Sequence, residues 1–182
     1  MHLTIDFQAP IYVVSQTQTS NALGGTYTTN YTYAGAKAHL TGGGFLGFRQ
    51  VAAWDAQTGL VTTTTYGQDY PNQGLPLAVE KRTGGGQLLN QVQNTWQNTA
   101  LGGGAYHRSD LVQTVEQSWD LNGLGLPRTK TNTSYDAYGN ATQITVATDD
   151  GYTSTGPVSP YGHVKTTTNK PRLSISRHRA LG

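Results

Sequence analysis

The sequence alternates apolar and polar residues with a period of two, and turn-forming residues interrupt this alternation at short intervals. Residues 37–77 show it most clearly: positions 48–51 form a short alternating segment, Asp55 and Gly59 bound a short polar turn, and positions 60–66 are rich in Thr. Successive side chains of a strand point to opposite faces, and β-branched residues favour strands. This stretch therefore predicts two strands joined by a tight turn.

The same pattern recurs along the chain and predicts strands at residues 3–7, 11–19, 26–33, 77–83, 88–96, 111–119, 127–135 and 141–148. Turns are expected near residues 55–59, 84–86, 120–125 and 136–140, where Asp, Asn and Gly gather. No window places apolar residues at helical spacing, because Gly and β-branched residues interrupt each one. We therefore predict an all-β fold of successive antiparallel β-hairpins.

Three of these turns repeat one motif, in which an aromatic residue and Asp are followed by a nearby Gly. They are Trp54-Asp55 with Gly59, Trp119-Asp120 with Gly123, and Tyr135-Asp136 with Gly139 and Asn140. An Asp side chain can accept hydrogen bonds from backbone amides two residues on, and Gly or Asn tolerates the positive φ of a hairpin turn. Hairpins of this kind cannot bury a core alone and need stacked neighbours. The motif residues are therefore predicted to be structural, not catalytic.

Charge is distributed unevenly along the 182 residues, whose net charge is +2. Residues 1–164 hold seven basic and ten acidic side chains, a net of −3, whereas the last eighteen residues hold five basic side chains and no acidic one. The body therefore offers no basic footprint for nucleic acid. No apolar run reaches the roughly 18 residues of a membrane span, and residues 1–6 lack the features of a Sec signal peptide.

Candidate cofactor and metal motifs are weak. Gly42, Gly44 and Gly47 match the spacing of a dinucleotide fingerprint, but that fingerprint needs a following helix, and a hairpin is predicted here. Cysteine is absent, no His-x-x-x-His pair occurs, and His107 has no expected partner. We therefore predict no catalytic residue, no cofactor and no metal site, in a protein that is not an enzyme.

Two stretches resemble a known family. Residues 135–140 resemble the Tyr-Asp-x-x-Gly-Asn motif of YD-repeat (Rhs-type) proteins. The more specific stretch is Gly44-Phe45-Leu46-Gly47-Phe48, followed by Asp55, Gly59 and residues 74–77. It resembles the start of the repeat region in B subunits of insecticidal toxin complexes and in SpvB-like virulence proteins. The resemblance spans about residues 11–168.

In that family, YD repeats wind into a large hollow β-shell that encloses a C-terminal toxic polypeptide. The resemblance implies that residues 1–169 are a non-catalytic segment of such a shell, which encloses or displays a toxic polypeptide. It implies that the partners are other parts of a larger toxin shell or a toxin polypeptide. It also implies a secreted or extracellular location within a toxin assembly, reached without a Sec signal peptide.

A second interpretation is a β-rich module that binds carbohydrate or another surface. Its candidate residues are the aromatics Tyr31, Tyr33, Trp54, Tyr66, Trp96 and Trp119. Aromatic rings can stack on sugars, but they more often cover neighbouring strands of a sheet. Cell-surface glycans are therefore the secondary expectation for a partner.

The last residues differ in composition from the body. From Lys170 onward the sequence becomes basic and loses Thr and Tyr. A change of reading frame or a truncated gene explains this break better than a basic arm for nucleic acid or anionic membrane. We expect residues 170–182 to be a disordered tail, because they have too little apolar area to offset the entropy lost on ordering.

Overall fold

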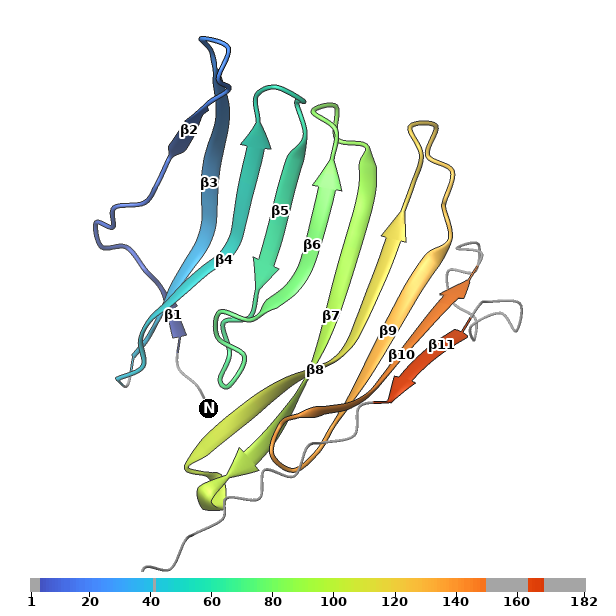
Figure 1. Cartoon of the computed structure of the whole chain (residues 1–182). Helices are drawn as coiled ribbons and strands as arrows, with labels where there is room; N and C mark the ends of the chain where they lie inside the picture. Colours follow the sequence, from blue (N-terminus) through green and yellow to red (C-terminus); the bar gives the residue numbers. More distant parts are fainter. Residues whose placement is uncertain (1–3, 41, 150–163, 169–182) are drawn as a thin grey trace, which may run out of the picture.

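The computed structural model describes residues 4–40, 42–149 and 164–168. These residues form one 11-stranded antiparallel sheet in the order β1-β3-β4-β5-β6-β7-β8-β9-β10-β11, with β2 also paired to β3 (Figure 1). The strands are β1 (Thr4–Asp6), β2 (Gln16–Ser20), β3 (Thr26–His39), β4 (Gly44–Asp55), β5 (Val61–Tyr66), β6 (Pro76–Arg82), β7 (Leu88–Leu101), β8 (Tyr106–Ser118), β9 (Arg128–Tyr135), β10 (Ala141–Asp149) and β11 (Val164–Thr168). The only helical element among the described residues is the 3-10 turn η1 (Gly102–Gly104) between β7 and β8. The prediction of an all-β fold of antiparallel hairpins is confirmed.

The sheet is a single twisted layer, and no other described element covers either face (Figure 1). Among the described residues, only Leu46, Gly67 and Gln68 are buried. A sheet normally buries one face against helices or a second sheet. This sheet therefore has no conventional core, and most of its side chains are half-buried against neighbours in the same layer.

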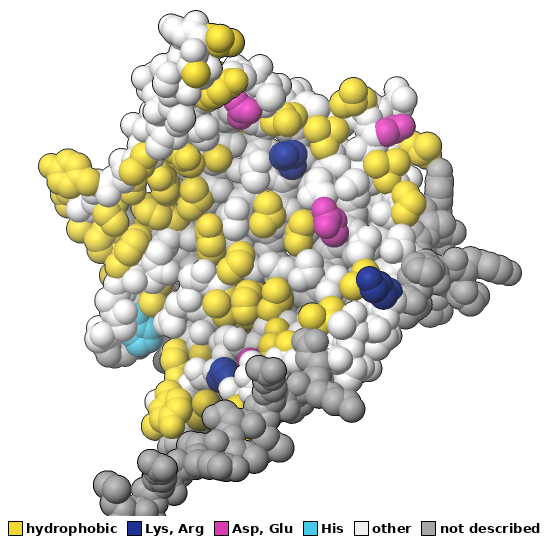
Figure 2. Space-filling view, viewed as in Figure 1, with side chains coloured by type: hydrophobic (Ala, Val, Ile, Leu, Met, Phe, Trp, Pro, Cys, Tyr) yellow, Lys and Arg dark blue, Asp and Glu magenta, His cyan; other side chains and the backbone are white. Residues whose placement is uncertain are grey.

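The two faces of the sheet differ in chemistry. One row across β3 to β7 pairs β-branched and aromatic residues in direct register, namely Tyr33, Val51, Thr64, Val79 and Val92. The adjacent row, which points to the opposite face, consists of Ala34, Gln50, Thr65, Ala78 and Gln93. Figure 2 shows hydrophobic side chains in a band across one face and gathered over the side of β1 to β3, with few charged side chains between them. Cross-strand pairs within each row are the main stabilising contacts of such a layer.

The hairpins lie where the pattern predicted them, although some strand boundaries differ. β7 and β8 have 14 and 13 residues. They are longer than predicted because their ladder continues as far as Leu101 and Tyr106, beside the turn η1. Of the strand predicted at residues 11–19, only the polar half forms, as β2. The prediction for residues 11–15 was wrong.

The strand stops there because the outer edge of β3 is paired in two separate pieces. β1 pairs with its C-terminal end and β2 with its N-terminal end. One further bond on each side joins the Phe7 amide to the Ala36 carbonyl and the Tyr31 amide to the Ser15 carbonyl. Seven residues (8–14) therefore lie opposite only four (32–35), and the three extra residues make the segment leave the edge.

No helix within the described ranges has the length and apolar character needed to cross a membrane. The expected tail, residues 170–182, lies outside the described residues.

Candidate functional site

The turn between β9 and β10 carries the Tyr-Asp motif, and Asp136 organises it. The Asp136 carboxylate accepts hydrogen bonds from the amides of Tyr138 (2.8 Å) and Asn140 (2.9 Å) and from the Asn140 side chain (2.9 Å). Gly139 has a φ of 89°, which a residue with a Cβ adopts only with strain. The Asn140 side chain first, and then the Asn140 amide, lower the pKa of Asp136 below its ordinary value, because they stabilise the ionised carboxylate.

The other two aromatic-Asp turns use the same chemistry. Asp120 accepts hydrogen bonds from the amides of Asn122 and Leu124 at 2.9 and 2.8 Å, so this turn repeats the Asp136 pattern. The Asp55 turn is one residue longer, because the Asp55 amide donates to the Leu60 carbonyl five positions on. The Thr58 hydroxyl, 2.7 Å from its carboxylate, is the main reason that the pKa of Asp55 lies below its ordinary value.

Two further turns share this geometry without the aromatic-Asp signature. The Asn21 side chain accepts hydrogen bonds from the amides of Leu23 and Gly25, both at 2.9 Å. The Thr83 hydroxyl accepts one from the Gln87 amide at 3.1 Å. The turn at residues 84–86 was predicted from its glycines. What both turns share is a polar residue followed three positions later by Gly, here Gly24 or Gly86.

Four of these five turns line up at one end of the sheet (Figure 1). Glutamine side chains join neighbouring turns in this row. Gln57 accepts a hydrogen bond from the Thr28 amide at 3.2 Å, next to the β2–β3 turn. Gln87 donates to the carbonyls of Asp120 (3.2 Å) and Leu121 (2.7 Å), in the β8–β9 turn. The hairpins are therefore held together at this end by side chains as well as by the strand ladders.

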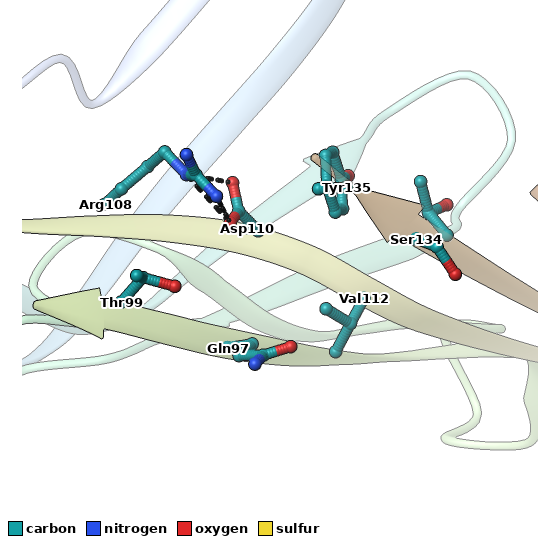
Figure 3. A pocket seen from close by; sticks show the side chains of 8 residues that line it. Gln97, Thr99, Arg108, Asp110, Val112, Ser134 and Tyr135 are labelled. Atoms are coloured by element: carbon teal, nitrogen blue, oxygen red, sulfur yellow. Dashed lines mark hydrogen bonds and ion pairs between the residues drawn. The ribbon is translucent and has the colours of Figure 1, made fainter. Parts of the chain in front are cut away.

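The Tyr-Asp turn lies at the opposite end, and Arg108 of β8 clamps it. The Arg108 guanidinium donates to the carbonyls of Ala137 (2.8 Å) and Asp136 (3.2 Å), and it forms an ion pair with Asp110 at 2.9 Å. Figure 3 shows this pair on β8, with Tyr135 on the neighbouring strand. The Tyr135 hydroxyl donates to the Leu111 carbonyl at 2.9 Å. These bonds connect β8 to β9 beyond Gln113, where their described backbone pairing ends.

The separation of β8 from β9 leaves a pocket of about 340 Å³ beside the clamp (Figure 3). It is lined by Gln97, Thr99, Arg108, Asp110, Val112, Thr133, Ser134 and Tyr135. The Nε and both Nη atoms of Arg108 already donate to Asp110 or to the turn carbonyls. The pocket therefore presents a neutralised ion pair and hydroxyl groups, and no nucleophile paired with a base.

The glycine-rich stretch at residues 44–48 forms an irregular part of β4. The register between β3 and β4 shifts there, and Leu46 is buried. Gln68, from the β5–β6 loop, donates to the carbonyls of Gly35 in β3 (2.6 Å) and Gly47 in β4 (3.0 Å) and so ties two strands to the loop. The dinucleotide-like spacing falls in this hairpin, and no helix follows it in the described chain.

The ring of Phe45 packs at the centre of an aromatic cluster. Its centroid lies 5.0 Å from that of Phe7 and 5.6 Å from that of Phe48, and Phe48 lies 4.9 Å from Tyr33. The aromatic residues of the motif stretch thus contact one another within the layer.

His107 has a partner, contrary to the sequence-based expectation. Its Nδ1 lies 2.9 Å from the Tyr70 hydroxyl, and the two rings meet edge to face. Tyr70 lies in the β5–β6 loop, 37 residues away, so no local pattern revealed the contact.

Several aromatics considered for glycan binding have internal partners. The Trp96 indole donates to the Pro76 carbonyl at 3.0 Å, and the Tyr33 hydroxyl donates to the Val14 carbonyl at 2.8 Å. Trp54 is among the exposed aromatic side chains. Within the described part of the chain, no three His, Asp or Glu side chains are grouped as metal ligands would be.

This geometry defines a class: a single-layer antiparallel sheet of hairpins, built on repeated Asx-type turns that include a Tyr-Asp-x-x-Gly-Asn turn. Residues 5–74 match the family model described as the insecticide toxin TcdB middle/N-terminal region. The resemblance to the repeat region of toxin-complex B proteins is therefore confirmed. Comparison with curated protein sequences gives no match.

Two solved structures share the fold. The crystal structure of TcdB2-TccC3 without its hypervariable C-terminal region aligns with a TM-score of 0.65 and 15% identity, over 77% of this chain and 10% of the other. The structure of TcdB2-TccC3-Cdc42 aligns with a TM-score of 0.64 and 14% identity, over 84% of this chain and 10% of the other. The chain thus spans about a tenth of the length of these solved chains.

Proposed function

We propose that this chain is a non-catalytic wall segment of a YD-repeat β-shell that encloses or displays a toxic polypeptide. The observation that carries the proposal is the single-layer sheet, whose hairpins repeat one turn chemistry and are joined by side chains. A layer of this kind separates two spaces without needing a core of its own. The TcdB-type match and the fold shared with TcdB2-TccC3 support the same assignment.

The proposal extends to partners, location and domain limits. Because the similar solved structures contain TcdB2 together with TccC3, we propose other toxin-shell parts or a toxin polypeptide as partners. Such an assembly acts outside the cell, in the manner of secreted virulence proteins. We assign residues 1–169 to the shell wall and residues 170–182 to a tail that is not part of it.

Sequencing the DNA on both sides of the coding region, and expressing the longest open reading frame found, tests the proposal. We expect further Tyr-Asp turns and a hollow particle in electron micrographs. A polypeptide inside that particle should resist added protease until denaturant opens the wall. A solid particle, or an inner polypeptide that protease digests at once, would contradict the assignment.

The carbohydrate-binding alternative is tested separately, by titrating a glycan library against tryptophan fluorescence. The internal partners of Trp96 and Tyr33 make these residues poor stacking platforms. We therefore expect no saturable change in fluorescence.

A further inference from the structure

The β8–β9 turn contains the one Asn-Gly pair of the sequence, Asn122-Gly123. Both residues are exposed, and within the described part of the chain no hydrogen bond reaches the Asn122 side chain. An Asn before Gly is chemically labile, because Gly has no Cβ to shield its amide nitrogen from the neighbouring side-chain carbonyl. This pair is therefore a candidate site of covalent modification.

The equivalent turns of the sheet lack this pair. The residue before the positive-φ glycine is Leu23 in the β2–β3 turn, Gly85 in the β6–β7 turn and Tyr138 in the β9–β10 turn. In the β9–β10 turn an Asn follows the glycine instead. This residue, Asn140, precedes Ala141, and its side-chain amide donates to Asp136 at 2.9 Å. The labile pair therefore distinguishes the β8–β9 turn from turns of the same geometry.

We propose that Asn122 deamidates spontaneously and that the turn built on Asp120 controls the rate. The Gly123 nitrogen attacks the Cγ atom of Asn122, the Cγ–Nδ2 bond breaks, and ammonia leaves with the proton of the Gly123 amide. Water then opens the resulting cyclic imide at one of its two carbonyls. Opening at Cγ gives aspartate, and opening at the main-chain carbonyl gives isoaspartate, in which the main chain passes through Cγ. In both cases the amide NH₂ is exchanged for OH.

The folded turn restrains the attacking nitrogen. The Gly123 amide donates to the Asp120 carbonyl at 3.0 Å. The Asp120 carboxylate holds the amides on either side, those of Asn122 at 2.9 Å and Leu124 at 2.8 Å. The nitrogen can attack only after these hydrogen bonds open. The rate in the folded chain is therefore the rate in the open turn multiplied by the population of that open state.

Either product weakens the turn. Isoaspartate lengthens the main chain between the amides of residues 122 and 123, so the Asp120 carboxylate no longer lies opposite both amides that it holds. Aspartate at this position places a second negative charge in the same turn. Gln87 donates to the Leu121 carbonyl of this turn at 2.7 Å. Deamidation therefore also loosens the side-chain link between the β6–β7 and β8–β9 turns.

Peptide mapping by mass spectrometry tests the proposal on the 182-residue chain, aged in mildly alkaline buffer with and without urea. We expect the peptide that contains Asn122 to gain the mass difference between an amide and an acid, more slowly in the folded chain than in urea. Asp120→Ala should raise the rate in the folded chain about tenfold or more, because it removes the acceptor of two turn amides. Circular dichroism shows whether this variant keeps its strands. If it does not, the comparison with urea decides.

Asn140 is the internal control, because it lies in the equivalent turn and precedes Ala141. Its peptide should stay unmodified over the same time. Asn122→Ser is the matched variant, and it should keep slow hydrogen exchange at the Leu124 amide during ageing, whereas the original chain loses it. The proposal is wrong if Asn122 stays intact in the aged folded chain. It is equally wrong if Asn122 reacts as fast in the folded chain as in urea, or if Asn140 reacts as fast as Asn122.

Discussion

At the scale of single residues, the turns of this sheet depend on one polar side chain and one glycine. Asp136 holds the amides two and four positions on, and Gly139 supplies the positive φ between them. Both groups lie within five residues of sequence, so local chemistry alone forms the turn. Gly139 has a second constraint, because a Cβ built there would lie 3.2 Å from the Cδ of Arg108.

We expect Gly139→Val to lower the free energy of unfolding by about 1–3 kcal/mol, since a β-branched residue is strained at positive φ. Arg108 would also have to move away from the turn carbonyls. The urea midpoint of the purified variant gives the measurement.

Gly85→Val is the control for that experiment. Gly85 lies in the equivalent β6–β7 turn without a positive φ, and a Cβ there meets nothing closer than 3.7 Å. Its cost should stay below about 0.5 kcal/mol. His107→Ala is unsuitable as a neutral comparison, because it removes the contact with Tyr70. Equal shifts for the two glycine variants would count against the turn assignment.

The lowered pKa of Asp136 predicts a dependence of stability on pH. Its folded pKa lies below its unfolded one, so the carboxylate stabilises the fold above about pH 4. That contribution is lost as the pH falls through the unfolded pKa and then the folded pKa. We therefore expect Asp136→Asn to lower the urea midpoint at pH 6 and to lower it less at pH 3.

Asp69→Asn removes the same charge as a control. Asp69 is exposed, and within the described chain its carboxylate accepts no hydrogen bond. Its effect on the midpoint should be small at both pH values. If Asp136→Asn shifted the midpoint equally at both pH values, the ionised carboxylate would not be the stabilising form.

At the scale of elements, each hairpin is stabilised mainly by its neighbours. The β7–β8 hairpin runs past the rest of the sheet (Figure 1). Its outer part is held by Arg108 on the Tyr-Asp turn and by His107 on the β5–β6 loop. At the other end, Gln87 joins the β6–β7 turn to the β8–β9 turn. Where the backbone hydrogen bonds of the strand ladder end, side-chain hydrogen bonds therefore hold the hairpins together.

Removing one of these links should loosen the turn that it holds without unfolding the sheet. Gln87→Ala leaves the carbonyls of Asp120 and Leu121 without their donor, at a cost of about 1 kcal/mol. We expect faster hydrogen exchange at the amides of residues 122–124. Gln93→Ala, at an exposed position of β7, should leave that exchange unchanged. Unchanged exchange in Gln87→Ala would mean that the strand ladders alone fix the turn.

At the scale of the whole molecule, stability is spread over a layer and not concentrated in a core. Leu46 is the only buried hydrophobic side chain among the described residues, so no single large-to-small substitution should be decisive. The rows of cross-strand pairs extend over at least five strands. A layer of this kind gains from further strands or layers placed against it, as the proposed shell would provide.

The composition of residues 170–182 predicts that they add nothing to this layer. They hold four of the five basic side chains found after residue 164, with no acid to pair with them. We expect deletion of residues 170–182 to leave the thermal midpoint unchanged. A clear fall would show that the segment docks on the sheet, and the interpretation as a change of reading frame would then fail.

The period-two pattern and the Asp-Gly turns determined the fold class and the hairpin positions, because both depend on residues that are neighbours in the chain. They placed the turns at Asp55, Asp120 and Asp136, and the motif stretch 44–48 indicated the resemblance to toxin-complex B proteins. The contribution of these turn and motif residues to stability and function stays a prediction until the variants are measured.

Tertiary structure alone decided how the hairpins are joined and where an edge is interrupted. Arg108 reaches the Tyr-Asp turn across 28 and 29 residues, and Gln87 reaches its carbonyls across 33 and 34. The exposed segment at Ile11 to Val14 reads as a strand in isolation. It leaves the sheet because β1 and β2 pair with β3 in registers that differ by three residues. Pairing register depends on both strands of a pair. It therefore cannot be predicted from the alternation of apolar and polar residues within one strand.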